Sequence, residues 1–377
     1  MSIPEFSKQQ SKAYEAVGRW LKNGTDHQQV FRLFGYAGTG KTSIARRIAE
    51  QIDGKVVYAA FTGKAALRMA QVGCADASTI HSLIYIYVGP RYSPTGFELN
   101  PDSAAASAAL IVIDECSMVG QTLAEDLLSF GRPVLVIGDP GQLPPVDGPG
   151  YFMRDKPDIM LTEIHRQAEN DPIIQLATLA RQGKKLPIGE FGRSRVLGKD
   201  DEPSTNAPFD MVLCGTNRIR CGHNLRRRCT EGRSDVFPEP GEQLICLRND
   251  NRLVIRNGEI FRVDATLGID SETQRLGLVV QSLDLPDRAP IKVNVPIQCF
   301  TNPAAKPERV SKGSQFFDYA YAVTVNKSQG SQWPNVLVFD ESKSWDREGA
   351  KQGKNWLYTA ITRASESVTI AHPPKWS

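Results

Sequence analysis

The feature that most constrains this chain is a glycine-rich stretch near its N-terminus, Gly35 to Thr42, which reads GYAGTGKT. It fits the pattern G-x-x-x-x-G-K-[ST] at every fixed position. An apolar run, Val30 to Phe34, precedes it as a buried strand, and a helix-prone run, Ser43 to Gln51, follows it. A glycine-rich turn that binds nothing is the alternative, but the strand–loop–helix context favours a site for a nucleoside triphosphate.

The loop residue types suit phosphate chemistry. Glycines let the backbone approach phosphate closely, and the N–H groups at the start of the helix point at the anion. We expect Lys41 to reach the β- and γ-phosphates and the Thr42 hydroxyl to hold Mg²⁺. The expected ATP contacts come from Gly35, Tyr36, Ala37, Gly38, Thr39, Gly40, Lys41 and Thr42.

Composition sets the class of protein. A chain of 377 residues is long enough for two or three domains, and 41% hydrophobic with 23% charged residues is typical of a globular protein. The net charge of +3 permits nucleic acid only if basic residues cluster. The seven cysteines are scattered without a C-x-x-C pair, so we expect reduced thiols and a cytoplasmic location. No signal peptide and no membrane span are expected.

Apolar strands alternate with helical segments along most of the chain, which predicts an α/β fold built on parallel sheets. The predicted strands of a first block are Val30–Phe34, Val56–Phe61, Leu110–Ile113 and Val134–Ile137. Those of a second block, beginning near Leu161, are Met211–Cys214, Ala320–Val325, Val336–Phe339 and Val368–Ala371. Residues 84–103 predict a small hairpin, and residues 240–314 a small inserted β-barrel.

Two further strand ends carry polar residues that suit phosphate hydrolysis. The apolar strand from Leu110 ends in Asp114 and Glu115. We expect Asp114 to position Mg²⁺ and Glu115 to orient and deprotonate the attacking water. The strand from Val134 leads to Gln142, whose amide can sense a γ-phosphate or the attacking water. The alternatives are a solvated strand end for Asp114 and Glu115 and an ordinary Pro-rich turn for Gln142.

These motifs together resemble the superfamily 1 helicases, specifically the RecD-like group and the compact phage Dda-type helicases. The resemblance runs in order over nearly the whole chain, which makes it highly specific. The matching segments are Phe6 to Ala13 (Q motif), Gly35 to Thr42 (I), Thr62 to Ala66 (Ia), Ser78 to Ser82 (Ib), Asp114 and Glu115 (II), Gly138 to Pro145 (III), Leu161 to Arg166 (IV), Tyr321 to Gly330 (V) and Tyr358 to Arg363 (VI).

The resemblance assigns roles to several of these residues. It implies that Gln10 bonds the adenine edge and that Arg166 and Arg363 bring positive charge to the γ-phosphate. ATP would lie in a cleft between two RecA-like domains, and closing of the cleft would drive movement along a nucleic-acid strand. A surface salt bridge is the alternative for either arginine taken alone.

The resemblance also implies a track for single-stranded DNA along the loops that follow the strands. Hydroxyl, amide and lysine donors suit phosphate contacts that are independent of sequence. The expected contacts are Thr62, Lys64, Thr79, His81, Thr216, Asn217, Thr324, Lys327, Ser328 and Gln329. Family members often have His at position 326, where this chain has Asn326. The arginines of residues 216–228 are read equally well as a solvated helix face.

The resemblance further implies an accessory hairpin and barrel. We expect Phe97 to act as a wedge in a separation pin, although packing of the aromatics against their own domain is as good an interpretation. The inserted barrel resembles an SH3-like domain. The expected domains are 1–160 with the pin at 84–103, then 161–240 with 315–377, and the barrel at 241–314.

The sequence thus predicts an ATP- and Mg²⁺-dependent DNA helicase that moves 5′→3′ by family resemblance. The expected partners are single-stranded and forked DNA and proteins of replication, recombination or repair, with the chain acting as a monomer. Because no large N-terminal extension precedes the motifs, the compact phage type is favoured, in a host cytoplasm if phage-encoded. Two alternatives stay open: an RNA or RNA–DNA helicase, and a nucleic-acid-stimulated ATPase clamp that does not unwind.

Overall fold

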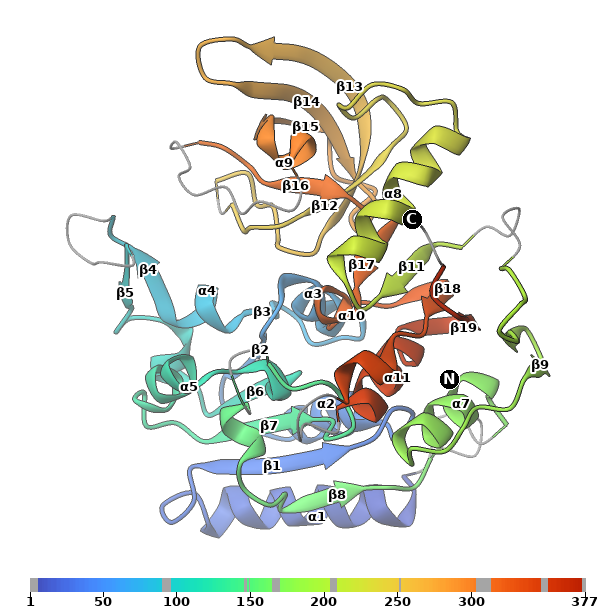
Figure 1. Cartoon of the computed structure of the whole chain (residues 1–377). Helices are drawn as coiled ribbons and strands as arrows, with labels where there is room; N and C mark the ends of the chain where they lie inside the picture. Colours follow the sequence, from blue (N-terminus) through green and yellow to red (C-terminus); the bar gives the residue numbers. More distant parts are fainter. Residues whose placement is uncertain are drawn as a thin grey trace. The chain divides into compact units, whose positions relative to one another are not determined.

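The computed structural model of the chain is shown in Figure 1; it describes residues 6–89, 96–145, 148, 150–164, 170–203, 209–250, 252–302, 313–346 and 352–374. The chain divides into two compact units, Met1–Ile174 and Gln175–Ser377, and the division falls within α7 (Pro172–Arg181). Each unit contains a six-stranded sheet of mainly parallel strands, so the predicted α/β fold is confirmed.

The first unit is built on a fully parallel sheet with the strand order β3-β2-β6-β7-β1-β8. Its strands are β1 (Val30–Gly35), β2 (Val56–Ala60), β3 (Ser78–Thr79), β6 (Leu110–Asp114), β7 (Val134–Gly138) and β8 (Ile159–Leu161). Its helices are α1 (Lys8–Asn23), α2 (Lys41–Ala49), α3 (Gly63–Gln71), α4 (Ile80–Ile84) and α5 (Gln121–Leu128), with 3-10 turns at Ala104–Ser107, Cys116–Met118 and Tyr151–Met153.

Apolar side chains alternate between the two faces of this sheet and bury a core on each. Leu110 and Val112 of β6 pack against α1, α2 and α3, whereas Ile111 and Ile113 pack on the opposite face with residues of α4 and α5. A strand buried on both faces is expected to read as a continuous apolar run, which is what β6 shows. Because the strands are parallel, their carboxyl ends meet at one edge, where loops bind ligands in such sheets.

Two element boundaries differ from the sequence expectation. Helix α2 begins at Lys41 rather than Ser43, because Gly40 takes a left-handed conformation and acts as the N-cap. Leu161, expected to open the second block, is the last residue of the edge strand β8, which pairs in parallel with β1 (Gly35↔Leu161). That pairing buries Leu161 in the first unit's core.

A two-stranded antiparallel hairpin leaves the first unit after α4. It consists of β4 (Tyr85–Tyr87) and β5 (Phe97–Leu99), with Tyr85 opposite Leu99 and Tyr87 opposite Phe97. These strands lie within the predicted hairpin at 84–103. Residues 90–95, which include Tyr92, lie outside the described residues.

The second unit has a six-stranded sheet with the order β17-β11-β18-β19-β10-β9, parallel except for the edge pair β9–β10. Its strands are β9 (Gly189–Phe191), β10 (Ser194–Val196), β11 (Met211–Cys214), β17 (Ala322–Thr324), β18 (Trp333–Phe339) and β19 (Ala364–Ala371). Its helices are α8 (Asn217–Thr230), α10 (Val325–Ser328) and α11 (Gly353–Ile361), with a 3-10 turn at Ser342–Trp345.

A separate antiparallel sheet of the second unit has the order β15-β14-β13-β12-β16. Its strands are β12 (Gln243–Cys246), β13 (Ile260–Asp270), β14 (Arg275–Ser282), β15 (Ile291–Pro296) and β16 (Phe317–Tyr319), and α9 (Gln298–Thr301) packs with them. Alternate residues of β14, such as Leu276, Leu278 and Val280, are fully buried in a core of their own. Strands β12 to β15 fall within residues 240–314, the segment predicted to form a small inserted β-barrel. Strand β16 follows that segment and joins the sheet because it pairs with β12 (Leu244↔Tyr319).

Candidate nucleotide and nucleic-acid sites

The phosphate loop joins β1 to α2 at the carboxyl edge of the first sheet. Gly38 and Gly40 have φ angles of 78° and 77°, a region that side chains rarely adopt. Gly35 is required for a different reason, because a Cβ there would lie 2.7 Å from Thr39 Oγ1 and 2.8 Å from Leu161 Cβ. The glycine pattern is therefore dictated by the shape of the loop itself.

Polar contacts hold the loop in shape. Lys41 Nζ donates to the Tyr36 carbonyl oxygen at 3.0 Å, and Thr39 Oγ1 donates to the same oxygen at 2.8 Å. Gln10, only 4% exposed in α1, donates from Nε2 to the Thr39 carbonyl at 3.1 Å. Since the N-cap Gly40 has no side chain, it leaves the first N–H groups of α2 to donate to an anion.

Thr42 and Asp114 come together as an oxygen pair beside this loop. Thr42 Oγ1 donates to Asp114 Oδ2 at 3.1 Å, and the Glu115 backbone N–H donates to Asp114 Oδ1 at 2.8 Å. Burial raises the pKa of the Asp114 carboxyl, and the charge of Glu115 raises it further, while Lys41 and Thr42 oppose the shift. A half-buried pair of acids beside a hydroxyl suits a hard divalent cation, whose charge would offset the cost of removing Asp114 from water.

Glu115 and Gln142 follow neighbouring strands, β6 and β7. Glu115 has a φ of 52°, a left-handed conformation that is uncommon outside glycine and that re-aims the chain directly after Asp114. Gln142 is 9% exposed, and its backbone N–H donates to the Asp139 carbonyl at 3.2 Å. The structure thus places the predicted residues of motifs I, II and III on one edge of one sheet.

The predicted DNA contacts of the first unit lie at two helix starts on the same edge. Thr62 is the N-cap of α3 and its Oγ1 accepts from Ala65 N at 3.2 Å. Thr79 is the N-cap of α4 and its Oγ1 accepts from Ser82 N at 3.1 Å. Both hydroxyls therefore stabilise helices. Lys64 lies in the first turn of α3, and β2 and β3 pair at Ala60↔Thr79, which places the two helix starts side by side.

A row of aromatic rings joins α4 to the hairpin. The His81 ring centroid lies 4.6 Å from those of Tyr85 and Phe97, and Phe97 lies 5.3 Å from Tyr87. Burial of the imidazole lowers the pKa of His81, so the ring is neutral at neutral pH. The Tyr85 hydroxyl donates to Asp126 of α5. Phe97 is therefore partly packed against its own domain.

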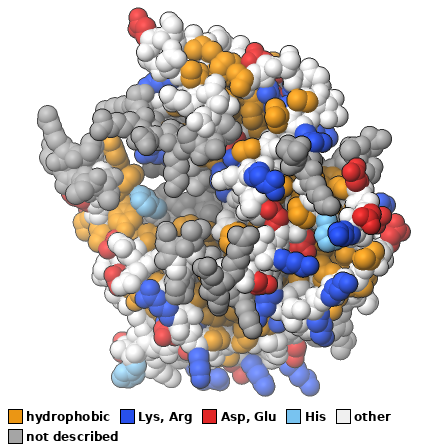
Figure 2. Space-filling model, viewed as in Figure 1, with side chains coloured by type: hydrophobic (Ala, Val, Ile, Leu, Met, Phe, Trp, Pro, Cys, Tyr) orange, Lys and Arg blue, Asp and Glu red, His pale blue; other side chains and the backbone are white. Residues whose placement is uncertain are grey.

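The hairpin also exposes apolar surface. Tyr87 is 63% exposed, Ile86 44% and Leu99 38%. Figure 2 shows hydrophobic side chains gathered at the left of the view, over β4 and β5. An exposed apolar cluster of this kind is typical of a binding surface.

The two predicted DNA contacts at the start of α8, Thr216 and Asn217, are already bonded to other side chains, one of which is a carboxylate distant in sequence. Thr216 is the N-cap of α8, and its Oγ1 donates to Glu341 Oε1 at 2.9 Å. Glu341 Oε2 also accepts from the backbone N–H groups of Gly215 at 2.5 Å and Thr216 at 3.1 Å. Asn217 follows, and its Oδ1 accepts from Arg220 Nε at 3.0 Å. No signal in the local sequence links Glu341 to Thr216, because 125 residues separate them.

The segment Thr324 to Gln329 begins at the last residue of β17 and contains the short helix α10. Ser328 and Gln329 are buried, and Ser328 Oγ donates to the Val325 carbonyl at 2.8 Å. Burial lowers the pKa of Lys327, and the charge of Arg220 lowers it further, whereas Asp318 opposes the shift. The segment is thus fixed by backbone contacts, with Lys327 beside a buried ion pair.

The two predicted arginine fingers have different outcomes. Arg166 lies outside the described residues. Arg363 is 2% exposed, and its guanidinium donates to the carbonyls of Thr359 at 3.1 Å and Ser331 at 3.2 Å and to Thr362 Oγ1 at 3.1 Å. It is therefore held within the second unit.

The basic run at 216–228 does not form an evenly solvated face. Arg220 and Arg228 are 2% and 4% exposed and pair with Asp318 and Glu242, so for these two the solvated interpretation was wrong.

No helix in the part of the chain that the structure describes is long and apolar enough to cross a membrane.

Two family models match the chain. Residues 5–194 match the model described as AAA domain, which is just over half of the chain. Residues 319–371 match the model described as UvrD-like helicase C-terminal domain.

Two curated relatives share 30% identity with the chain. One is the ATP-dependent RecD2 DNA helicase of Deinococcus radiodurans, matched over 368 residues, which cover 89% of this chain and 46% of the relative. The other is the ATP-dependent DNA helicase dda of Enterobacteria phage T4, matched over 199 residues, which cover 49% of this chain and 44% of the relative. The chain therefore spans less than half the length of these relatives.

Solved structures share the fold. Bacteroides Pif1 bound to ssDNA has a TM-score of 0.59 and 20% identity, covering 97% of this chain and 92% of that one. A structure described as the basis for DNA unwinding at forked dsDNA by two coordinating Pif1 helicases has a TM-score of 0.61 and 19% identity with the same coverage.

Proposed function

We propose that this chain is an ATP-dependent DNA helicase. It belongs to the AAA-domain P-loop proteins, and we place it among the superfamily 1B helicases of the RecD and Dda type. The observation that carries the proposal is the phosphate loop with its Thr42–Asp114 oxygen pair, 3.1 Å apart, at the carboxyl edge of a parallel sheet. The two curated relatives are named DNA helicases, and we propose DNA as the substrate of this chain.

The chain's own residues account for hydrolysis as follows. Lys41 exchanges its contact with the Tyr36 carbonyl for the β- and γ-phosphate oxygens, and the loop N–H groups bind the remaining charge. The residues that fit Mg²⁺ are Thr42 and Asp114, and the ion, when bound, supplies positive charge at the phosphate oxygens. Glu115 takes the proton of the attacking water, and Gln142 orients that water.

Two arginines complete the proposed machinery by stabilising charge on the transferred phosphoryl group. We assign this role to Arg166 and Arg363. Arg363 would exchange its carbonyl contacts with Ser331 and Thr359 for phosphate oxygens, so its engagement requires a rearrangement inside the second unit. Gln10 braces Thr39 of the loop, and we assign its side-chain amide to the adenine edge.

Single-stranded DNA would contact the loop segments of both units through phosphate. In the first unit these are Thr62, Lys64, Thr79 and His81, and in the second Thr216, Asn217, Thr324, Lys327, Ser328 and Gln329. Because several of these hydroxyls cap helices, their neighbouring backbone N–H groups are the natural phosphate donors. Movement is proposed to run 5′→3′, as in the family that the sequence resembles.

The hairpin and the antiparallel sheet are proposed as a separation pin and an SH3-like barrel. Closure of the barrel is supported by the pairing of Gln315 with Asn294, which joins the segment before β16 to β15: Gln315 N donates to Asn294 O at 3.0 Å, and Asn294 N to Gln315 Oε1 at 2.8 Å. The domain boundaries 1–160, 161–240 with 315–377, and 241–314 belong to this proposal with two shifts, because Leu161 lies in the first sheet and β16 in the antiparallel one. The proposal also includes the RecA-like character of the two parallel sheets, a monomeric state, a cytoplasmic location, and a role in replication, recombination or repair.

The first test of this function is ATP hydrolysis with and without single-stranded DNA. The protein should hydrolyse ATP only with Mg²⁺, and DNA should stimulate it. Lys41→Ala should abolish turnover while leaving the melting temperature of the protein unchanged, since Lys41 contributes one contact to a partly exposed loop. Near-normal hydrolysis by this variant would refute the phosphate-loop assignment.

A further inference from the structure

Helix α8 carries a buried polar stripe that the proposed machinery does not use. Arg220, Asn224 and Arg228 are spaced four residues apart and so lie on one face of the helix. They are 2%, 4% and 4% exposed. Each makes hydrogen bonds to residues outside α8, and we call these three residues the α8 stripe.

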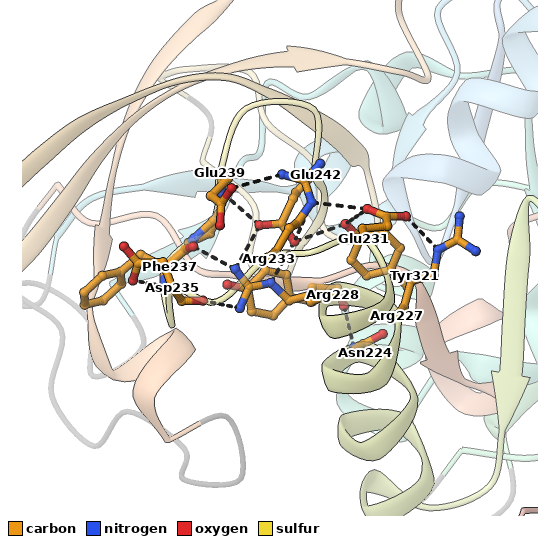
Figure 3. A network of polar contacts seen from close by, with 12 residues as sticks. Asn224, Arg227, Arg228, Glu231, Arg233, Asp235, Phe237, Glu239, Glu242 and Tyr321 are labelled. Carbon is orange, nitrogen blue, oxygen red and sulfur yellow. Dashed lines mark hydrogen bonds and ion pairs between the residues drawn. The ribbon is translucent and has the colours of Figure 1, made fainter.

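Arg228 is the most heavily bonded member of the stripe (Figure 3). Its Nε and Nη2 donate to Glu242 Oε1 and Oε2 at 2.8 and 3.0 Å, a two-point contact. Its Nη1 donates to the Asp235 carbonyl at 2.6 Å and its Nη2 to the Phe237 carbonyl at 2.9 Å. The guanidinium also lies 4.4 Å from the centre of the Tyr319 ring. A planar guanidinium held in this way has one orientation.

Glu242 is fully buried and satisfied on both oxygens (Figure 3). Oε2 also accepts from the Glu239 backbone N–H at 2.8 Å, and Oε1 also accepts from the Tyr321 hydroxyl at 3.0 Å. Glu242 immediately precedes β12, where the chain leaves the parallel sheet for the antiparallel one. Arg228 therefore fixes the outgoing connection to α8.

Asn224 and Arg220 fix the returning connection. Asn224 Oδ1 accepts from the Ala322 N–H at 2.7 Å, and its Nδ2 donates to the Tyr319 carbonyl at 3.1 Å. Arg220 forms a buried ion pair with Asp318 of β16. The two connections also run side by side, because Ala320 N donates to the Gln243 carbonyl at 2.9 Å.

The contacts of Arg220, Asn224 and Arg228 with residues outside α8 act as three anchors, and together they form a rigid connection, which we call the joint, between α8 and the antiparallel sheet. Arg220 and Arg228 are eight residues apart, which is about 12 Å along a helix, so the anchors oppose rotation as well as separation. Apolar residues of similar size could serve stability equally well, since a buried ion pair must first offset the loss of hydration. What directional bonds add is a fixed orientation of the antiparallel sheet relative to α8.

The joint is continuous with the proposed DNA contacts. Arg220 Nε donates to Asn217 Oδ1 at 3.0 Å, and Ala322, which Asn224 binds, lies two residues before Thr324. We propose that the α8 stripe is a set of positioning residues that makes the antiparallel sheet move as one body with the DNA-binding segments of the second unit. The stripe thereby passes ATP-driven movement to strand separation, and this inference rests on the proposed helicase function.

The test compares base pairs separated per ATP hydrolysed in the wild-type protein and in variants of the stripe. Arg228→Met with Glu242→Leu removes both charges together, and Arg228→Lys keeps the charge but loses the two-point contact. The matched control is Arg193→Met with Glu366→Leu, because that ion pair lies in the same unit but is exposed. DNA-stimulated hydrolysis, a 5′-tailed duplex and thermal unfolding are measured for all four proteins.

We expect both stripe variants to keep DNA-stimulated hydrolysis within about twofold and to lose base pairs per ATP, by about tenfold for the double variant. The control should change neither quantity. Two outcomes would overturn the inference. If hydrolysis and unwinding fall in proportion, the stripe has a merely structural role. If neither activity changes in Arg228→Lys and in the double variant, so that base pairs separated per ATP stay as in the wild-type protein, the stripe does not couple the two. A wild-type protein that separates no strands would instead overturn the proposed function, and this inference with it.

Discussion

Replacing Gln10 by alanine tests how the N-terminal helix supports the phosphate loop. Gln10 Oε1 accepts from the Ser7 backbone N–H at 3.0 Å, and Ser7 Oγ accepts from Gln10 N at 3.3 Å, which forms a capping box at the start of α1. Gln10 Nε2 donates to the Thr39 carbonyl at 3.1 Å in a buried contact. One side chain thus closes a helix end and holds the middle of the phosphate loop.

The cost of Gln10→Ala follows from these two contacts. Losing half of a capping box costs about 0.5–1 kcal/mol. Leaving the buried Thr39 carbonyl unpaired costs about 1–3 kcal/mol, and the better helix propensity of alanine returns a few tenths. The sum is about 1–4 kcal/mol, or a fall of about 2–15 °C in the melting temperature of a unit of this size.

The assay is thermal unfolding without nucleotide, followed by KM for ATP and for GTP. Gln71→Ala is the matched control, because Gln71 is exposed at the end of α3 in the same unit and should cost less than about 0.5 kcal/mol. A loosened loop should raise KM for both nucleotides, and a larger rise for ATP would add the adenine contact. An unchanged melting temperature would refute the bracing role of Gln10.

Three further predictions concern single side chains. Phe97→Ala should weaken unwinding more than DNA-stimulated hydrolysis, because its ring packs on His81 at the hairpin and not at the phosphate loop; equal losses in the two assays would remove the pin. Glu341→Gln should lower the free energy of unfolding by about 1–2 kcal/mol, because the charged acceptor of Gly215 N and Thr216 N at the start of α8 is lost. It should also tighten binding of single-stranded DNA at low salt, and weaker binding would show that Glu341 instead holds Thr216 in place for DNA. Burial, aided by Arg227, lowers the pKa of His223 to about 4, whereas the unfolded chain takes up this proton near pH 6.5. The free energy of unfolding should therefore fall as the pH drops from 6.5 to 4, by about 3 kcal/mol in full. Urea midpoints at pH 7 and pH 5 should differ more for the wild-type protein than for His223→Gln, and an equal difference would contradict the burial of this ring.

The phosphate loop was predictable because its chemistry is local. The fixed glycines, Lys41 and Thr42 lie within eight residues, and the flanking apolar strand and helix are visible in the same stretch. The strands β6 and β7 were predictable for the same reason, since each is a short apolar run ending in a polar turn. What the sequence places less well is the first residue of a helix, as Lys41 shows, because a left-handed glycine can cap it.

The contacts of α8 were not predictable, because their partners are distant in sequence. Arg220 and Asp318 are 98 residues apart, and Thr216 and Glu341 are 125 residues apart. An arginine-rich helix has the same composition whether its charges are solvated or paired in the interior, so only the fold distinguishes the two. The same applies to Phe97, whose contacts with His81 depend on the hairpin register.

Strand separation on three duplexes tests the central claim most directly. One duplex has a 5′ single-stranded tail, one a 3′ tail and one is blunt, and each is incubated with the protein, ATP and Mg²⁺. The account predicts separation only from the 5′ tail, with no product when Lys41→Ala replaces the wild-type protein. DNA-stimulated hydrolysis without any separated strand would contradict it and leave a translocase or clamp.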